Sequence, residues 1–204
     1  MGDMTKYEKR VQDKSRFAYF LGLAYRWYKN YEYEKIRDRA RRKGAVVGNC
    51  VVMPKDIGNS LNQNFIIGNH CCIHNVEFSS YLHKVKVGNN VIIGDRVKIV
   101  RGSHNIDSPD WENVAKHEVL EIDDYVWLCP DCVIMPSVKK IGYGAVVGAN
   151  AVVVKDVPPM AVVCGNPAVE IKKRKCVHDN LVVESLLSGD YYAYKEAWKK
   201  KNNI

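Results

Sequence analysis

The chain has 204 residues, of which 47% are hydrophobic and 26% are charged, and its formal net charge is +8. This length and composition fit one soluble globular domain with short appendages. No apolar run reaches the length that spans a bilayer, and the start lacks the apolar core of a signal peptide. These features argue against a membrane-spanning or secreted protein and predict a cytoplasmic one.

The first 43 residues carry most of the positive charge, with thirteen Lys and Arg against six Asp and Glu. Residues 4–43 contain no proline and are rich in helix-forming and aromatic residues, which predicts a helical N-terminal segment over 1–43. Its basic and aromatic character fits peripheral contact with an anionic membrane surface. Packing as a cap on the following domain is the alternative. No nucleic-acid-binding module accompanies the charge, so nucleic acid is not an expected partner.

Residues 44–174 show a six-residue period. A helix repeats its apolar face every three to four residues and an ordinary strand every two, so this period predicts short strands joined by tight corners. Three such units make one triangular coil of about eighteen residues, and stacked coils bury a continuous core. The fold class expected is therefore an all-β solenoid. The aliphatic-Gly pairs that open the units are Val47-Gly48, Ile57-Gly58, Ile67-Gly68, Val87-Gly88, Ile93-Gly94, Ile141-Gly142 and Val147-Gly148.

A second small or aliphatic residue follows each leading residue by four positions, and this pattern includes Cys71 and Cys132. Both are interpreted as packing residues. Seven cysteines without a signal peptide make a disulfide framework unlikely on physical grounds. Cys129 and Cys132 have the CxxC spacing of redox and zinc sites, which is the competing interpretation. No second CxxC or pair of histidines completes a zinc set.

The period breaks where surface loops are expected, around 63–65, over 75–86 and, at greatest length, over 101–118. Functional residues of a solenoid often lie on such loops. After the repeats, residues 175–204 are predicted to form a C-terminal helical segment interrupted near Gly189. Both helical segments are expected to cover the ends of the solenoid.

Residues 44–174, roughly two-thirds of the chain, resemble the hexapeptide-repeat acyltransferases. The likeness is greatest to the sugar and polysaccharide O-acetyltransferases, such as those acting on maltose, galactosides, colanic acid and capsules. It implies a left-handed parallel β-helix, a homotrimer with active sites between subunits, acetyl-CoA as co-substrate and a sugar hydroxyl as acceptor. The stretches that carry it are Gly102–Asp107 (GSHNID), Tyr125–Leu128 (YVWL), Ala145–Pro159 (AVVGANAVVVKDVPP) and Cys164–Ala168 (CGNPA).

The resemblance also implies roles for individual residues. His104, in the 101–118 loop, matches the general base that takes the proton of the acceptor hydroxyl. His117, in the same loop, is a second candidate. Asn75 and Trp127 match acceptor-binding and tunnel-lining positions. Asp107 and Asp110 are candidates to orient the imidazole or to hold acceptor hydroxyls, although both are also typical turn residues. The CoA-binding positions expected are Ala149, Val154 and Lys155 for pantetheine, and Lys172 and Arg174 for the phosphates. No metal is expected.

Two departures from the family pattern affect the cofactor site. Leu128 is followed by Cys129-Pro130 where the family usually has glycine, and Val169 stands where a basic residue often follows the GNPA stretch. Two other functions stay open at this stage. One is a zinc hydrase of the γ-carbonic-anhydrase type, for which His70, His74 and His104 would be the ligands. The other is a hexapeptide scaffold without catalytic activity.

Overall fold

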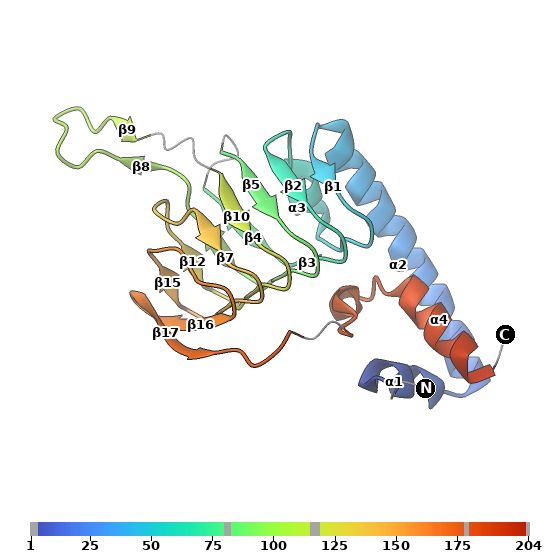
Figure 1. The fold of residues 1–204 in the computed structure, drawn as a ribbon. Coiled ribbons are helices and arrows are strands. Elements are labelled where there is room, and N and C mark those ends of the chain that lie inside the picture. Colours follow the sequence, from blue (N-terminus) through green and yellow to red (C-terminus); the bar gives the residue numbers. More distant parts are fainter. Residues whose placement is uncertain (1–3, 80–82, 115–118, 178–179, 203–204) are drawn as a thin grey trace.

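The computed structural model describes residues 4–79, 83–114, 119–177 and 180–202. Its main body is a solenoid of triangular coils (Figure 1). Successive short strands along the chain belong in turn to three faces, and each face is a parallel β-sheet. The predicted all-β solenoid, a left-handed β-helix with flanking helices, is confirmed. Each six-residue unit of the sequence therefore corresponds to one face of a coil.

The three faces are parallel sheets, here called sheets A, B and C, and a fourth small sheet is a hairpin. Sheet A contains β1 (Val46–Val47), β2 (Phe65–Ile67), β5 (Val85–Val87), β10 (Leu120–Ile122) and β13 (Lys140–Ile141). Sheet B contains β3 (Cys72–Ile73), β6 (Ile92–Ile93), β11 (Trp127–Leu128), β14 (Val146–Val147), β16 (Ala161–Gly165) and the antiparallel β17 (Ala168–Lys173). Sheet C contains β4 (Val76–Phe78), β7 (Val97–Ile99), β12 (Val133–Ile134) and β15 (Val152–Val153).

The core runs along the axis because the coils stack in register. Ile67, Val87, Ile122 and Ile141 are aligned partners across sheet A, and each is almost fully buried. Each such side chain contributes about 1.5–3 kcal/mol of transfer free energy. Cys71 and Cys132 are fully buried in the same core, beside the strands of sheets B and C, and burial raises the pKa of each thiol to about 12. The interpretation of these two cysteines as packing residues is therefore confirmed.

A ladder of side-chain hydrogen bonds stabilises the corner between sheets A and B. The backbone N–H of Asn49 donates to Asn69 Oδ1 at 2.9 Å, and that of Asn69 donates to Asn89 Oδ1 at 2.8 Å. The ladder continues from the Asn89 N–H to Asp124 Oδ1 at 2.7 Å. Glycine is needed beside it, because a Cβ on Gly68 would lie 2.6 Å from the Gly88 carbonyl oxygen.

The first coil departs from the predicted repeat. Ile57-Gly58 has the form of a leading pair, yet it lies in helix α3 (Lys55–Ser60), where the other coils have a sheet C strand. Pro54 begins this helix in an extended conformation. Gly58 packs so closely on the preceding long helix that a Cβ would lie 2.2 Å from Ile36 Cγ2. Contact between helices, which the hexapeptide pattern does not encode, determined the structure here.

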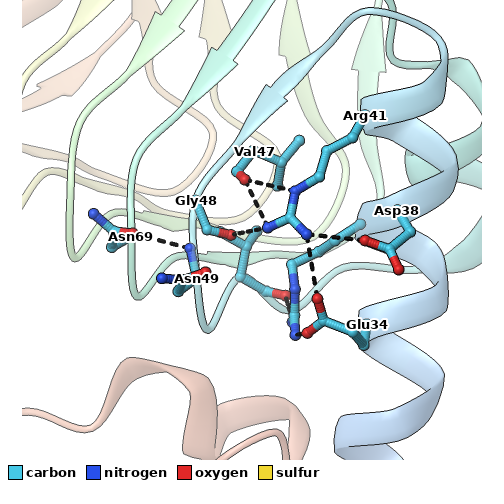
Figure 2. A network of polar contacts seen from close by, with 9 residues as sticks. Glu34, Asp38, Arg41, Val47, Gly48, Asn49 and Asn69 are labelled. Atoms are coloured by element: carbon cyan, nitrogen blue, oxygen red, sulfur yellow. Dashed lines mark hydrogen bonds and ion pairs between the residues drawn. The ribbon is translucent and has the colours of Figure 1, made fainter.

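Two helices form the N-terminal segment, α1 (Lys6–Gln12) and α2 (Arg16–Arg42). Helix α2 lies across the β1 end of the solenoid (Figure 1). Its last turns are anchored by Arg41, whose guanidinium donates to the Val47 carbonyl at 3.0 Å and contacts Glu34 and Asp38 at 3.2 and 3.0 Å (Figure 2). The helix therefore covers the open end of the first coil.

The C-terminal segment returns along the solenoid as a short 3₁₀ helix, η1 (Val183–Leu187), followed by α4 (Tyr191–Asn202). Helix α4 packs on α1 and α2 through a stack of Tyr19 and Trp198 with ring centroids 4.0 Å apart. Buried Asp190 accepts from Tyr7 Oη at 2.6 Å and from Arg26 Nε at 2.9 Å. Among the described helices, none combines the length and apolar character that crossing a bilayer requires.

Candidate functional site

The longest break in the repeat forms a hairpin of β8 (Ser103–His104) and β9 (Asn113–Val114). The strands are antiparallel, and a hydrogen bond of 2.8 Å from the Asn105 N–H to the Glu112 carbonyl extends the pairing. The hairpin leaves the solenoid between β7 and β10, at the corner between sheets C and A, and projects away from the coils (Figure 1). It therefore presents its side chains beyond the body of its own chain.

His104 lies on this hairpin with its side chain exposed. Its Nδ1 lies 2.6 Å from the carbonyl oxygen of Trp111, a residue with φ of 51° in the opposite arm. A carbonyl oxygen only accepts hydrogen bonds, so Nδ1 carries the proton. This tautomer leaves Nε2 with a free lone pair, which is the state a general base requires.

Asp107 and Asp110 shape the tip of the hairpin. The Asp107 N–H donates to Asn105 Oδ1 at 3.1 Å, and the Asp110 N–H donates to Ser108 Oγ at 3.4 Å. Both aspartates are exposed, and the partner found for the His104 ring is a backbone carbonyl, not a carboxylate. His117, the second candidate base, lies outside the described residues.

Arg101 fixes the root of the hairpin, and the sequence analysis did not single it out. Its side chain is 1% exposed, and its Nη1 donates to the carbonyl of Val138 at 2.8 Å and to that of Pro136 at 3.4 Å. Its backbone N–H donates to Ser79 Oγ at 2.9 Å. The residue therefore ties the start of the hairpin to the coils before and after it. Its position as the first residue of the longest break is the one signal that would have identified it.

A groove of about 800 Å³ lies between sheet B and the returning C-terminal segment. Its floor consists of outward-facing apolar side chains, among them Trp127 and Val146, which are aligned neighbours on β11 and β14. Lys172 and Arg174 lie on its rim, and Val183 and Leu186 of η1 form part of its wall. An apolar floor beside cationic side chains suits an amphipathic anion.

Lys172 and Arg174, the two predicted cations among those lining the groove, differ in their contacts. The Arg174 guanidinium donates to the carbonyls of Tyr125 and Gly144 at 3.1 and 3.2 Å, so it binds two corners of the solenoid. Lys172 is exposed on β17. The Lys172 ammonium group is thus better placed than the Arg174 guanidinium to contact a ligand phosphate.

The other predicted residues lie along two edges of the solenoid. Asn75 and Ala149 are exposed at the corner between sheets B and C. Val154 and Lys155 follow β15 at the corner between sheets C and A, the same edge from which the His104 hairpin leaves. One chain therefore gathers Trp127, Lys172 and Arg174 in one groove and places the remaining candidates on either side of sheet C.

The three histidines considered as zinc ligands lie in separate places. His70 contacts Glu184 at 3.2 Å, His74 Nε2 lies 3.6 Å from Cys72 Sγ, and His104 contacts Trp111. In the part of the chain that the structure describes, these histidines do not converge as a metal-binding group. Cys129 is half-buried and Cys132 is buried, which fits packing.

Comparisons with known proteins give a consistent picture, although no family model matches the sequence. An acetyltransferase named for colanic acid biosynthesis in Escherichia coli (strain K12) is 29% identical over 161 residues, which is 78% of this chain and 81% of that protein. An acetyltransferase of Schizosaccharomyces pombe is 36% identical over 90 residues, 44% of this chain and 43% of that protein. The segments matched in the first curated relatives thus span less than half of those proteins' length.

Among solved structures, a hexapeptide-repeat-containing acetyltransferase of Vibrio cholerae, crystallised with acetyl-coenzyme A, is 27% identical with a TM-score of 0.55. The superposition covers 71% of this chain and 90% of that one. The stacked coils are thus shared with a hexapeptide-repeat acetyltransferase of solved structure, and the curated proteins similar to this chain include a colanic acid biosynthesis acetyltransferase and a galactoside O-acetyltransferase.

Proposed function

We propose that this protein transfers an acetyl group from acetyl-CoA to a hydroxyl of a sugar or polysaccharide precursor, with His104 as general base. The observation that carries the proposal is the contact between His104 Nδ1 and the Trp111 carbonyl, which leaves Nε2 able to accept a proton. The Vibrio cholerae relative with acetyl-CoA supports the donor, and the Escherichia coli relative supports a glycan acceptor.

The reaction needs one base because a thioester carbonyl is already electrophilic. His104 Nε2 removes the proton of the acceptor hydroxyl as its oxygen attacks the carbonyl carbon. The resulting tetrahedral oxyanion collapses with cleavage of the carbon–sulfur bond. The imidazolium then returns its proton to the departing CoA thiolate, which yields the acetyl ester, free CoA thiol and neutral His104. Direct transfer of this kind requires both substrates to be held together, with no acyl-enzyme.

The placement of the candidates supports a site completed by a second copy of the chain. His104 projects from the corner between sheets C and A, whereas Asn75 and Ala149 lie on the corner between sheets B and C. Neighbouring copies around a three-fold axis would bring the hairpin of one to the other edge of the next. Sedimentation should therefore give three times the 23.2 kDa mass of the chain.

Calorimetric titration with acetyl-CoA tests the donor assignment without assuming an acceptor. We expect saturable binding with one site per chain. Trp127→Ala should weaken it about tenfold, because a half-exposed indole on the groove floor supplies apolar contact worth at least 1.4 kcal/mol. Tyr192→Ala, an exposed aromatic on α4, is the matched control and should bind normally. A folded protein that binds no acetyl-CoA would instead support the scaffold alternative.

The proposal includes peripheral contact with an anionic membrane through α2. Phe17, Phe20, Leu21, Tyr28 and Tyr31 recur at helical spacing on one face, and each is at least 50% exposed. Arg16 precedes this face and Lys35 continues it, both exposed. Two exposed cations beside aromatic side chains fit the acidic headgroups and the interface of an anionic membrane. An enzyme held there would meet lipid-linked glycan acceptors.

Flotation with vesicles tests this contact. The protein should float with vesicles of phosphatidylcholine containing phosphatidylglycerol and should remain at the bottom with pure phosphatidylcholine. Combined replacement Phe17→Ser, Phe20→Ser and Leu21→Ser should abolish flotation. Ile171→Ser, which removes an apolar side chain of similar exposure on β17, should not. Equal flotation of the triple variant and the wild type would remove membrane contact by α2 from the proposal.

A further inference from the structure

Three side chains of metal-binding type lie close together outside the β8–β9 hairpin: Cys50, His70 and Glu184. The thiol sulfur, an imidazole nitrogen and a carboxylate oxygen all lie within 4.8 Å of one another. Within the described residues, this is the one group of three histidine, cysteine or acidic side chains with that property. Nothing in the acyl-transfer chemistry uses these residues.

The solenoid itself brings two of the ligands together. Cys50 and His70 occupy the same corner, between sheets A and B, in consecutive coils, with φ of 56° and 54°. The His70 N–H donates to the Asn49 carbonyl at 2.9 Å, which fixes the spacing of the two corners. Asn90 occupies the equivalent corner of the next coil with φ of 56°. Stacking of coils therefore sets the thiol and the imidazole side by side.

The third ligand comes from the C-terminal segment. Glu184 belongs to η1, whose neighbouring Val183 packs against Val52 and Cys72 of sheet B. Glu184 is 6% exposed, and its Oε1 lies 3.2 Å from His70 Nδ1. The Gly189 N–H donates to the Glu184 backbone carbonyl at 2.9 Å, so Glu184 is held both by its backbone and by its side chain. Its carboxylate thus points at the corner from a rigid position.

The charges around the cluster favour a cation. A nearly buried carboxylate is costly unless it is compensated, and the Glu184 side chain is 8% exposed beside a half-exposed His70. Arg37, whose charge acts on the Cys50 thiol, donates to the Glu34 carboxylate and the Val51 carbonyl. Burial, with a contribution from Glu184, raises the pKa of the Cys50 thiol, so a metal would have to displace its proton.

We propose that Cys50, His70 and Glu184 bind a divalent transition metal of the zinc class, which fastens η1 to the first two coils. Thiolate, imidazole and carboxylate are its usual ligands, and three of them leave a position for water. Tetrahedral coordination needs ligand atoms about 3.5 Å apart, which rotation of the half-exposed His70 side chain can supply. Binding releases the Cys50 thiol proton to solvent as the metal–sulfur bond forms.

The consequence lies in the neighbouring groove. Val183 and Leu186, which lie on either side of Glu184 within η1, form part of the wall of the groove on sheet B. A metal at the cluster would hold that wall in place against the coils. This role in fastening η1 is independent of whether the protein transfers acetyl groups.

The test uses the full-length, reduced protein with Zn²⁺ and Co²⁺ as probes. Equilibrium dialysis should give one Zn²⁺ per chain, and Co²⁺ should produce a thiolate charge-transfer band in the near ultraviolet. Cys50→Ser should abolish the band, and His70→Asn and Glu184→Gln should each weaken Zn²⁺ binding at least tenfold. His70→Asn keeps the fold, because asparagine already occupies this corner at residue 90. Cys176→Ser, which removes an exposed thiol elsewhere, should leave both signals unchanged.

Two results would overturn the site: no thiolate band in the wild type, or unchanged Zn²⁺ stoichiometry in both Cys50→Ser and His70→Asn. Zn²⁺ should also raise the Tm of the wild type and leave that of His70→Asn unchanged. Acetyl-CoA titration of the same samples separates the two proposals. A wild-type protein that binds acetyl-CoA but no metal rejects only the metal site, whereas metal binding without acetyl-CoA binding rejects only the acetyltransferase.

Discussion

Replacing His104 with alanine should lower the rate of acetyl transfer by about 10²- to 10⁴-fold, the usual contribution of a general base. The affinity for acetyl-CoA should stay near that of the wild type, because the exposed imidazole lies on the projecting hairpin and not among the groove residues. The measurement is steady-state turnover with radiolabelled acetyl-CoA and an acceptor found by screening. Transfer of label avoids thiol reagents, which the seven cysteines would also consume.

Asp110→Asn is the matched control for His104→Ala. It removes another titratable side chain from the same hairpin and retains the Asp110 N–H that donates to Ser108 Oγ. This variant should keep nearly full activity. If His104→Ala retained wild-type turnover, the base would have to be another group, and the role assigned to the Trp111 contact would be wrong.

Replacing Arg101 with methionine should lower the free energy of unfolding by about 3 kcal/mol. The change removes two hydrogen bonds from a buried cation and leaves the carbonyls of Val138 and Pro136 without that donor. For a chain of this size the Tm falls roughly 2–4 °C for each kcal/mol, so thermal melting should resolve the effect. Activity should fall as well, because the root of the His104 hairpin is no longer fixed.

Arg96→Met provides the comparison for Arg101→Met. Arg96 also lies at a corner of the solenoid, but its side chain is 63% exposed and forms an ion pair with Asp131 at the surface. Exposed ion pairs contribute little to stability, so its Tm should change far less. Equal melting of the two variants would mean that the buried Arg101 contacts do not stabilise the root of the hairpin.

The sequence predicted the solenoid because its coils repeat a local rule. Each unit places an aliphatic residue inward and a turn-forming residue at the corner, and each coil contacts only its neighbours. The inward positions of Cys71 and Cys132 followed from the same rule. The rule failed at Ile57-Gly58, where the residues fit a repeat but contact with α2 produced helix α3.

The candidate site could be predicted from the sequence only through its resemblance to a family. That likeness named His104 and Trp127, but the partner of the imidazole is the backbone of Trp111, and a backbone carbonyl leaves no trace in side-chain identity. Asp107 and Asp110 were the side chains that the sequence suggested for orienting the imidazole. Arg101 was missed because the sequence alone does not distinguish a buried arginine from an exposed one.

The sequence by itself determined the parts of this protein that depend on neighbours about twenty residues apart or on helical spacing: the coils, their core and the aromatic face of α2. The tertiary structure alone decided the contacts made by the returning C-terminal segment. That segment creates the groove over Trp127 and brings Glu184 to His70 across 114 residues of sequence. The physical reason is that stacking repeats at a fixed interval, whereas the path of a single returning segment depends on which surface it can bury.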